Sequence, residues 1–235
     1  MSEVKQTNLL ERINRLKTDM KQASIKANRS ENEIMLLAVS KTQSIETIKQ
    51  AYQLGLNTFG ENYLQEALPK IHALDKSINW HFIGHIQSNK TKQIAENFSW
   101  VHTIDRLKIL KRLALQRPQE LEPLNLTLEI NLNNEATKSG FKLCDTDLID
   151  QCIDYCKTQT ALVLRGLMCM PKRTDNSKDQ RRNLSQMHQL LNQLNHRHNL
   201  TMDTLSMGTS YDLQSAILEG STIIRIGQAI FGKRN

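Results

Sequence analysis

The sequence predicts an α/β fold, a (β/α)8 or TIM barrel formed by a single domain over residues 1–235. Short apolar runs alternate with amphipathic segments along the chain, as in successive β–α units. Eight such units are present, and a length of 235 residues lies within the range of this fold. The alternative, a doubly wound open sheet, usually carries a glycine-rich turn after its first strand, and this sequence has none there.

The first 33 residues form an extension that leads into the barrel. Apolar side chains recur at helical spacing from Leu9 to Met20, which predicts an amphipathic helix. Residues 28–33 are polar and predict a loop before the first strand. We therefore expect an extra N-terminal helix, outside the eight repeated units.

The later elements carry their own signals. Gly55 has the position of a helix C-cap, Asp105 and Asp145 can each begin a helix, and prolines at 118 and 123 indicate a loop. Apolar residues at three- and four-residue spacing predict a long helix over 178–199. The expected strands are residues 34–39, 58–60, 80–84, 100–104, 125–131, 161–168, 204–207 and 222–226. The expected helices are residues 44–54, 63–74, 90–97, 105–116, 145–157, 178–199 and 211–218, with a short closing helix from about residue 228.

The composition limits the compartment and the partners. No stretch approaches the roughly 20 apolar residues of a membrane span. Residues 1–21 are charged and lack the apolar core of a signal peptide, so we expect a cytoplasmic protein. The four cysteines do not form a disulfide framework, nor the close pairs of a zinc site. The net charge of +7 would allow nucleic-acid binding, but aromatic residues, which stack on bases, make up only 5% of the chain. We therefore interpret the basic residues as solvated helix faces.

Two cations are placed at strand ends that meet when the barrel closes. Lys41 follows the apolar first strand, and Arg225 belongs to the last strand. Function in such barrels gathers at the carboxyl ends of the strands, and phosphate is often bound by the loops after strands seven and eight. Gly208 and Gly227 allow backbone N–H groups to approach an anion, while Ser210 adds a hydroxyl. The alternative is that these are ordinary turn residues.

The position of Lys41 makes the interpretation as a phosphate site more specific. Most lysines at a barrel mouth are surface cations, but one that follows an apolar strand and adjoins an arginine should have a lowered pKa. The resulting neutral amine attacks an aldehyde, and the phosphate site anchors a phosphorylated one. Pyridoxal 5′-phosphate is the obvious molecule, with Arg225 facing its ring nitrogen. Because arginine does not give up its proton, that nitrogen would stay unprotonated, and the ring would be a weak electron sink.

Several motifs, in order, resemble the pyridoxal phosphate homeostasis protein family. The resemblance covers roughly residues 34 to 232. It rests on residues 38–42 (AVSKT), 59–63 (FGENY), 80–84 (WHFIG), 87–90 (QSNK), 166–168 (GLM), 206–212 (SMGTSYD), 220–222 (GST), 225–227 (RIG) and 230–232 (IFG).

The resemblance implies a barrel like the N-terminal domain of alanine racemase, with the cofactor held on Lys41 as an internal Schiff base. It implies that Asn62 lies beside the ring and that Arg225 meets the ring nitrogen. The phosphate would be held by Ser210, by Gly227 and by the backbone at Thr209 and Gln228. Thr209 departs from the methionine expected in the family. Lys138 also falls where the family has a lysine, and we interpret it as a loop cation.

Two functions of different classes remain, and the carrier is favoured. The first is a non-catalytic binder that buffers pyridoxal phosphate and delivers it to apo-enzymes. The second is an amino-acid racemase, which needs a base on each face of the ring; Tyr63 and Tyr211 are the candidates for the second base. The chain ends eight residues after Gly227, which leaves no room for the second domain of alanine racemase, and we expect a monomer.

Two lesser alternatives are also open. A metabolite barrel that binds a sugar phosphate, and no pyridoxal phosphate, is a third function. His81 and His85 share a strand face and could bind a metal, but two ligands without a third partner favour a hydrogen-bonded role. We therefore predict no metal site.

Overall fold

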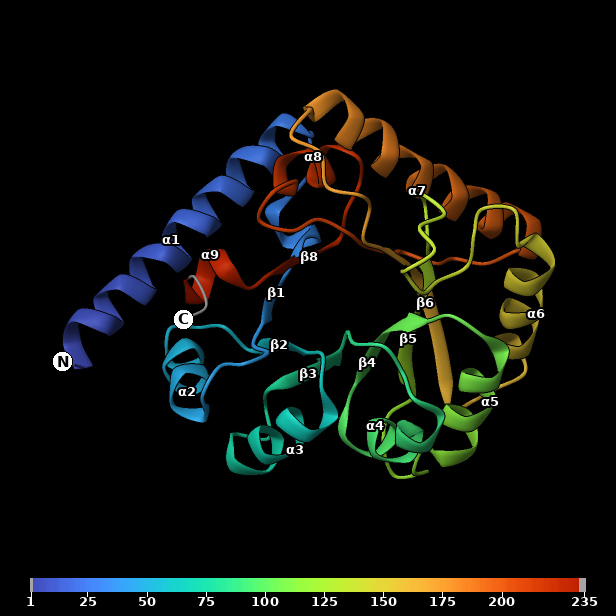
Figure 1. The fold of residues 1–235 in the computed structure, drawn as a ribbon, viewed down its shortest axis with the longest axis horizontal. Helices are drawn as coiled ribbons and strands as arrows, with labels where there is room; N and C mark the ends of the chain where they lie inside the picture. The colour runs from blue at the N-terminus through green and yellow to red at the C-terminus, as the bar shows by residue number, and fades with distance from the viewer. Residues whose placement is uncertain (1, 233–235) are drawn as a thin grey trace.

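The computed structural model describes residues 2–232, with side chains from residue 8 onward, and it confirms the predicted fold class. Eight parallel strands close into a barrel in chain order, and β1 pairs with β8 (Figure 1). The strands are β1 (Met35–Val39), β2 (Thr58–Glu61), β3 (Asn79–Phe82), β4 (Trp100–Ile104), β5 (Leu124–Ile130), β6 (Leu162–Cys169), β7 (Thr204–Ser206) and β8 (Ile223–Ile226).

Helices surround the barrel and connect successive strands. They are α2 (Ile45–Gln53), α3 (Leu64–Ala73), η2 (Ser88–Lys90), α4 (Thr91–Asn97), α5 (Leu107–Gln116), α6 (Thr146–Lys157), α7 (Ser177–His198), α8 (Leu213–Leu218) and α9 (Gln228–Phe231). The extra helix α1 (Ser2–Lys26) precedes them and packs along α8 and α9, so the first helix lies beside the end of the described chain (Figure 1). A short 3₁₀ turn, η1 (Glu31–Glu33), then leads into β1.

One difference from the predicted elements is at α8, which begins at Leu213 rather than at residue 211. The Asp212 carboxylate accepts hydrogen bonds from the N–H and the hydroxyl of Thr209. These bonds close a turn over residues 209–212 and keep Tyr211 and Asp212 out of the helix. The loop after β7 is therefore longer than the apolar spacing predicts.

The interior of the barrel is apolar at one end and polar at the other. Leu37, Trp100 and Ile223 form one buried cluster inside the strands. His81 stacks on Trp100, with ring centroids 5.3 Å apart, and a buried polar chain continues from it toward the mouth. The main apolar core lies outside the strands, between them and the helices. The barrel is therefore a filled core that ends in polar side chains.

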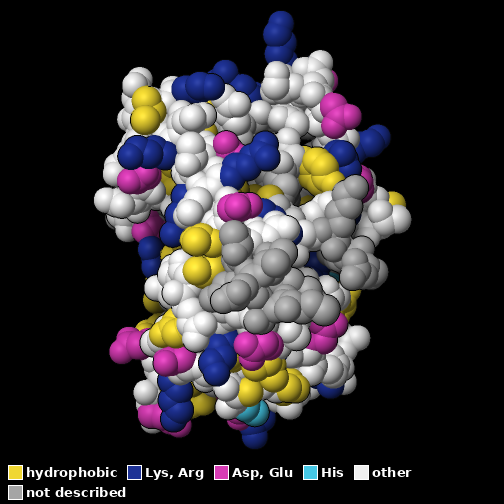
Figure 2. Space-filling view, turned by 90° about the vertical axis from the view of Figure 1, so that its left-hand side faces the viewer, with side chains coloured by type: hydrophobic (Ala, Val, Ile, Leu, Met, Phe, Trp, Pro, Cys, Tyr) yellow, Lys and Arg dark blue, Asp and Glu magenta, His cyan; other side chains and the backbone are white. Residues whose placement is uncertain are grey.

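The surface and the cysteines agree with the composition. The face that carries α1 shows lysines and arginines interspersed with acidic side chains, without one continuous basic field (Figure 2). Cys144, Cys152, Cys156 and Cys169 are all free. Within residues 2–232, no helix combines the length and apolar character that crossing a bilayer requires.

Candidate functional site

The predicted site residues all lie at the carboxyl ends of strands. Lys41 follows β1, Asn62 follows β2, Thr209 and Ser210 follow β7, and Arg225 lies on β8. Gly227 and Gln228 come where β8 passes into α9. The sequence therefore placed these residues at the same end of the barrel.

The closing seam of the barrel brings three of them together. Leu37 of β1 is in register with Arg225 of β8, so the residues that follow the two strands lie next to each other at the mouth of the barrel. There Lys41, Gly227 and Gln228 line one hollow of about 400 Å³. A Cβ added at Gly227 would lie 3.2 Å from the Val39 carbonyl oxygen, so glycine allows the end of β8 to lie close against β1.

The loop after β7 faces other hollows. Thr209 lines a hollow of about 230 Å³ together with Tyr211 and the residues after β6. Ser210 lines another, of about 300 Å³, against α1. Because Asp212 already accepts the Thr209 N–H, the predicted backbone contact at Thr209 requires exchange of that bond. Among the hollows described here, Lys41 therefore shares one with the β8–α9 turn, whereas Thr209 and Ser210 line others.

Arg225 is buried, and its guanidinium is held by a fixed set of acceptors. Nη1 donates to the Ser206 carbonyl and, at 2.7 Å, to the Ser206 hydroxyl, and Nη2 donates to the Cys169 carbonyl at 2.8 Å. Burial lowers the pKa of Arg225, whereas Cys169, Asp212 and Glu129 raise it. The charge is thus kept inside the protein by oxygen acceptors and by nearby acidic groups.

Two histidines extend this network into the barrel, and nothing in their spacing along the sequence connects them to Arg225. The Ser206 hydroxyl lies 2.8 Å from His102 Nδ1, and His102 Nε2 lies 2.9 Å from His81 Nδ1. Burial lowers the pKa of His81 to about 3 and that of His102 well below 6.5. Both rings are therefore neutral at pH 7, and they fix the hydroxyl that accepts from Arg225. Polar residues inside otherwise apolar strands were the available signal.

Asn62 offers an unsatisfied acceptor. Its Oδ1 is buried and has no hydrogen-bond partner among the residues that the structure describes. Orphaned buried polar atoms are uncommon and call for an explanation such as a missing ligand atom. Together with the close approach at Gly227 and the buried cation at Arg225, this acceptor fits a site for a polar, anionic ligand.

The position of Asn62 depends on a glycine of the neighbouring loop. A Cβ added at Gly84 would lie 1.9 Å from the Asn62 carbonyl oxygen. Gly84→Ala is therefore expected to push the Asn62 backbone outward and to cost about 1 to 3 kcal/mol, the range for overpacking. Urea unfolding measures this cost. Gly55→Ala is the control, because it meets no atom within 4 Å and adds strain only through a φ of +88°. An unchanged unfolding midpoint in Gly84→Ala would contradict the expectation.

Glu129 and Lys138 are two further charged residues near the mouth of the barrel. Burial, followed by the charge of Asp105, raises the pKa of Glu129 to about 7. Lys138 donates to Glu135 Oε1 at 2.6 Å and to the Met170 carbonyl at 3.0 Å. Lys138 therefore ties its loop to the end of β6, a more defined role than the solvated cation that the sequence predicted.

His81 and His85 lie in different surroundings. His81 is buried against His102, whereas the exposed His85 lies 3.1 Å from the Ser139 hydroxyl and 3.8 Å from Asp105. Within the described part of the chain, no group of three or more His, Cys, Asp or Glu side chains could hold a metal ion.

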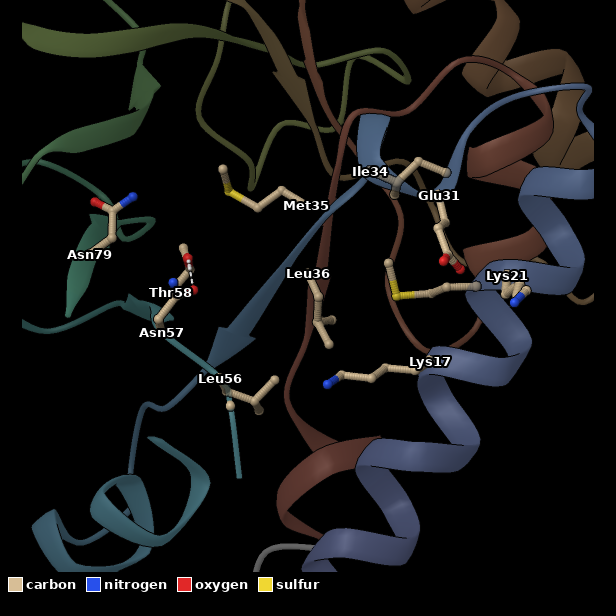
Figure 3. A pocket seen from close by; sticks show the side chains of 12 residues that line it. Lys17, Lys21, Glu31, Ile34, Met35, Leu36, Leu56, Asn57, Thr58 and Asn79 are labelled. Atoms are coloured by element: carbon tan, nitrogen blue, oxygen red, sulfur yellow. Dashed lines mark hydrogen bonds between the residues drawn. The ribbon is translucent and has the colours of Figure 1, made fainter. Parts of the chain in front are cut away.

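The largest of the hollows described here lies at the opposite end of the barrel. It measures about 590 Å³ and is bounded by α1 and the amino ends of β1, β2 and β3 (Figure 3). Its charged side chains, Lys17, Lys21 and Glu31, come from α1 and η1. It contains none of the predicted site residues, and we place the candidate site at the mouth.

This site lies in a barrel of the alanine racemase N-terminal type. Residues 13–235 match the family model described as "Alanine racemase, N-terminal domain". Alanine racemase from Corynebacterium glutamicum is similar in fold, with a TM-score of 0.71 at 15% identity, over 96% of this chain and 62% of that one.

Curated relatives with higher sequence identity show to which family of such barrels the chain belongs. The chain is 46% identical over 228 residues to the pyridoxal phosphate homeostasis protein of Pseudomonas aeruginosa, covering 97% of this chain and 96% of the relative. It is 43% identical over 217 residues to that of Escherichia coli K12, covering 91% of each. The chain therefore belongs to the pyridoxal phosphate homeostasis protein family.

A solved structure, that of PipY, is similar to this chain over nearly its whole length. PipY of Synechococcus elongatus has been solved without and with PLP bound. Its two structures have TM-scores of 0.81 to this chain at 29% and 27% identity, and each comparison covers 95% of this chain and 100% of PipY.

Proposed function

We propose that this protein binds pyridoxal 5′-phosphate at the mouth of the barrel, holds it as a Schiff base on Lys41 and takes part in its homeostasis and delivery to apo-enzymes, without catalytic turnover. The observation that carries the proposal is the hollow shared by Lys41, Gly227 and Gln228 at the seam of β1 and β8. The homeostasis proteins of P. aeruginosa and E. coli and the PLP-bound PipY structure support the cofactor.

The chemistry assigned to Lys41 is reversible. Its unprotonated amine attacks the aldehyde carbon of pyridoxal phosphate, a C=N bond forms, and the aldehyde oxygen leaves as water. The reverse reaction, with water, releases the aldehyde unchanged. A lysine at the end of β1 therefore suits storage and release.

The remaining residues bind and orient. We assign the phosphate to Ser210, to Gly227 and to the backbone of Gln228 and Thr209, the last after exchange of its bond to Asp212. Asn62 lies beside the ring in this proposal, and its orphaned Oδ1 supports that role. Arg225 faces the ring nitrogen and, because a guanidinium keeps its proton, leaves that nitrogen unprotonated. The bound ring is then a weak electron sink, which favours holding over catalysis.

The enzyme alternative needs a second base. Tyr63 and Tyr211 are both 54% exposed, and the Tyr211 ring is covered by the Arg173 guanidinium at 3.6 Å. Neither tyrosine is buried, and neither lines the hollow that Lys41 shares with Gly227 and Gln228. The names of the curated relatives, homeostasis proteins rather than racemases, also favour the carrier.

The carrier proposal predicts no sustained turnover. Purified protein loaded with pyridoxal phosphate is incubated with L-alanine and, separately, with D-alanine, and the enantiomers are separated by chiral chromatography. We expect racemisation far below roughly 1 s⁻¹, the lower end of typical enzyme rates. Turnover at or above that rate, lost in Tyr63→Phe or Tyr211→Phe, would establish the racemase instead.

The proposal also keeps three expectations from the sequence: one domain over residues 1–235, a monomer, and a cytoplasmic location. Sedimentation equilibrium of the loaded protein tests the monomer. Transfer is tested by adding the loaded protein to a pyridoxal phosphate-dependent apo-enzyme, with a trap for free cofactor present. Recovery of apo-enzyme activity despite the trap is expected for direct delivery.

A further inference from the structure

We propose that Lys70, Glu61 and Glu66 form a clamp that fixes the main chain on both sides of Lys41 and so presents its amine to the aldehyde. These are positioning residues, and the proposal rests on the function proposed above. All three come from β2 and α3, the unit that follows Lys41 in the chain.

Ser40, the residue before Lys41, is held by Lys70 and Glu61. Lys70 is only 5% exposed, although lysine is rarely buried. Its ammonium donates to the Ser40 carbonyl at 2.9 Å and to Glu61 Oε1 at 2.8 Å. The Ser40 hydroxyl donates to the same Glu61 oxygen at 2.6 Å. The peptide group that joins Ser40 to Lys41 is therefore fixed through its carbonyl oxygen and through the neighbouring side chain.

The residue after Lys41 is held by the same helix. The Thr42 N–H donates to Glu66 Oε2 at 2.8 Å, and that oxygen lies 3.9 Å from the Lys70 ammonium, one helical turn away. Thr42 has a φ of +66°, in the left-handed region that a β-branched residue rarely adopts. Such conformations persist only where the surroundings enforce them, and they gather at functional sites. The Glu66 contact is part of that enforcement.

Stability alone is a poor explanation for this ion pair. Glu61 is fully buried, and its Oε2 has no hydrogen-bond partner among the described residues. Burial raises the pKa of Glu61, whereas the hydrogen bonds from Lys70 and Ser40 lower it less than burial raises it. Buried ion pairs often stabilise no better than apolar side chains of similar volume, so stability does not account for this one and its contacts point to positioning. The positioned group is the peptide of Lys41, since Ser40 is the only residue outside the pair that Lys70 donates to in the described structure.

The test separates positioning from binding. Pyridoxal phosphate, which carries the aldehyde, and pyridoxine 5′-phosphate, which carries an alcohol there and cannot form a Schiff base, are each added to the purified protein. Stopped-flow absorbance follows the near-visible Schiff-base band, borohydride reduction with peptide mapping locates the label, and calorimetry gives the affinity for pyridoxine 5′-phosphate.

Lys70→Met and Glu66→Ala are expected to slow formation of the band by roughly 10- to 100-fold, the effect of misplacing a reacting group. Their affinity for pyridoxine 5′-phosphate should stay within about twofold of wild type, since ring and phosphate contacts are untouched. Glu66→Gln keeps an acceptor for the Thr42 N–H and should restore the rate. Lys92→Met is the matched control, because it breaks an exposed i, i+4 pair with Glu96 on α4 and should change neither quantity.

The outcomes are distinguishable. Normal band formation in Glu66→Ala, whose replaced side chain is 38% exposed and not needed for the core, would overturn the clamp. So would a parallel loss of pyridoxine 5′-phosphate affinity, which marks a general structural effect. A wild-type protein without the band, or labelled elsewhere than at Lys41, would overturn the proposed function itself. If Lys70→Met does not fold, the Glu66→Ala and Glu66→Gln pair decides the question.

Discussion

Lys41→Ala is expected to abolish the near-visible band of the loaded protein and all borohydride-stable labelling. The Schiff base requires an amine at the seam of β1 and β8, and Lys41 is the lysine that lines the hollow there. Non-covalent affinity, measured with pyridoxine 5′-phosphate, should fall much less, because the ring and phosphate groups stay in place. The combined loss of the band and retention of the non-covalent ligand is the largest effect we expect from a single substitution.

Lys138→Ala is the control for this experiment. Lys138 is held by Glu135 and by the Met170 carbonyl, in a loop at another part of the mouth. We expect Lys138→Ala to keep the band and the label at Lys41. Labelling of Lys138 with Lys41 unmodified would overturn the assignment of the covalent site. A band retained in Lys41→Ala would have the same consequence.

The fold was predictable because its signals are local. The alternation of apolar runs and amphipathic segments requires only the spacing of residues within each element. The count of eight units and the lack of a glycine-rich turn after the first strand then favoured a closed barrel over an open sheet. The start of α8 was not predictable in this way. It depends on the bonds from Thr209 to the Asp212 carboxylate, a side-chain choice that no apolar spacing reports.

The candidate site was predictable at the level of strand ends. A barrel gathers these ends at one mouth, so the pairing of β1, which leads to Lys41, with β8, which carries Arg225, followed from the order of the strands alone. The supporting residues could not be found this way. Lys70 reads as an ordinary helix lysine, and its burial becomes visible only when α3 packs under the β1 loop and brings its ammonium to the Ser40 carbonyl.

The same limit applies inside the barrel. His81 and His102 lie on neighbouring strands, and their contact with each other and with Ser206 depends on the register of three strands. Each histidine alone has an ordinary explanation as a buried polar residue. Together they link Arg225 to the aromatic layer at Trp100 and leave His81 Nε2 without a partner among the described residues.

Lowering the pH from 6.5 to 5 is expected to destabilise the fold through these two histidines. In the unfolded chain each ring binds a proton below about pH 6.5, whereas the folded pKa of His81 is about 3 and that of His102 lies well below 6.5. Stability that is present above pH 6.5 is therefore lost as the pH falls, by about 1.4 kcal/mol per pH unit for His81, and His102 adds a loss in the same direction. Glu129 acts in the opposite direction. Its folded pKa of about 7 exceeds the ordinary 4.5, so the folded state binds one extra proton between pH 7 and 4.5.

Among these three groups the two histidines outweigh Glu129, so a net loss of stability is expected between pH 6.5 and 5. His81→Phe tests the origin of that loss, because phenylalanine keeps an aromatic ring on Trp100 and removes one titrating group. At pH 7.5 we expect the variant to be about 1 to 2 kcal/mol less stable, since His102 loses a hydrogen-bond partner. Between pH 6.5 and 5 its free energy of unfolding, measured with urea at each pH, should fall less steeply than that of the wild type, because one of the two titrating histidines is gone. The exposed His85 provides the control, and His85→Phe should keep the wild-type slope. A wild-type slope in His81→Phe would mean that the acid sensitivity does not arise from His81.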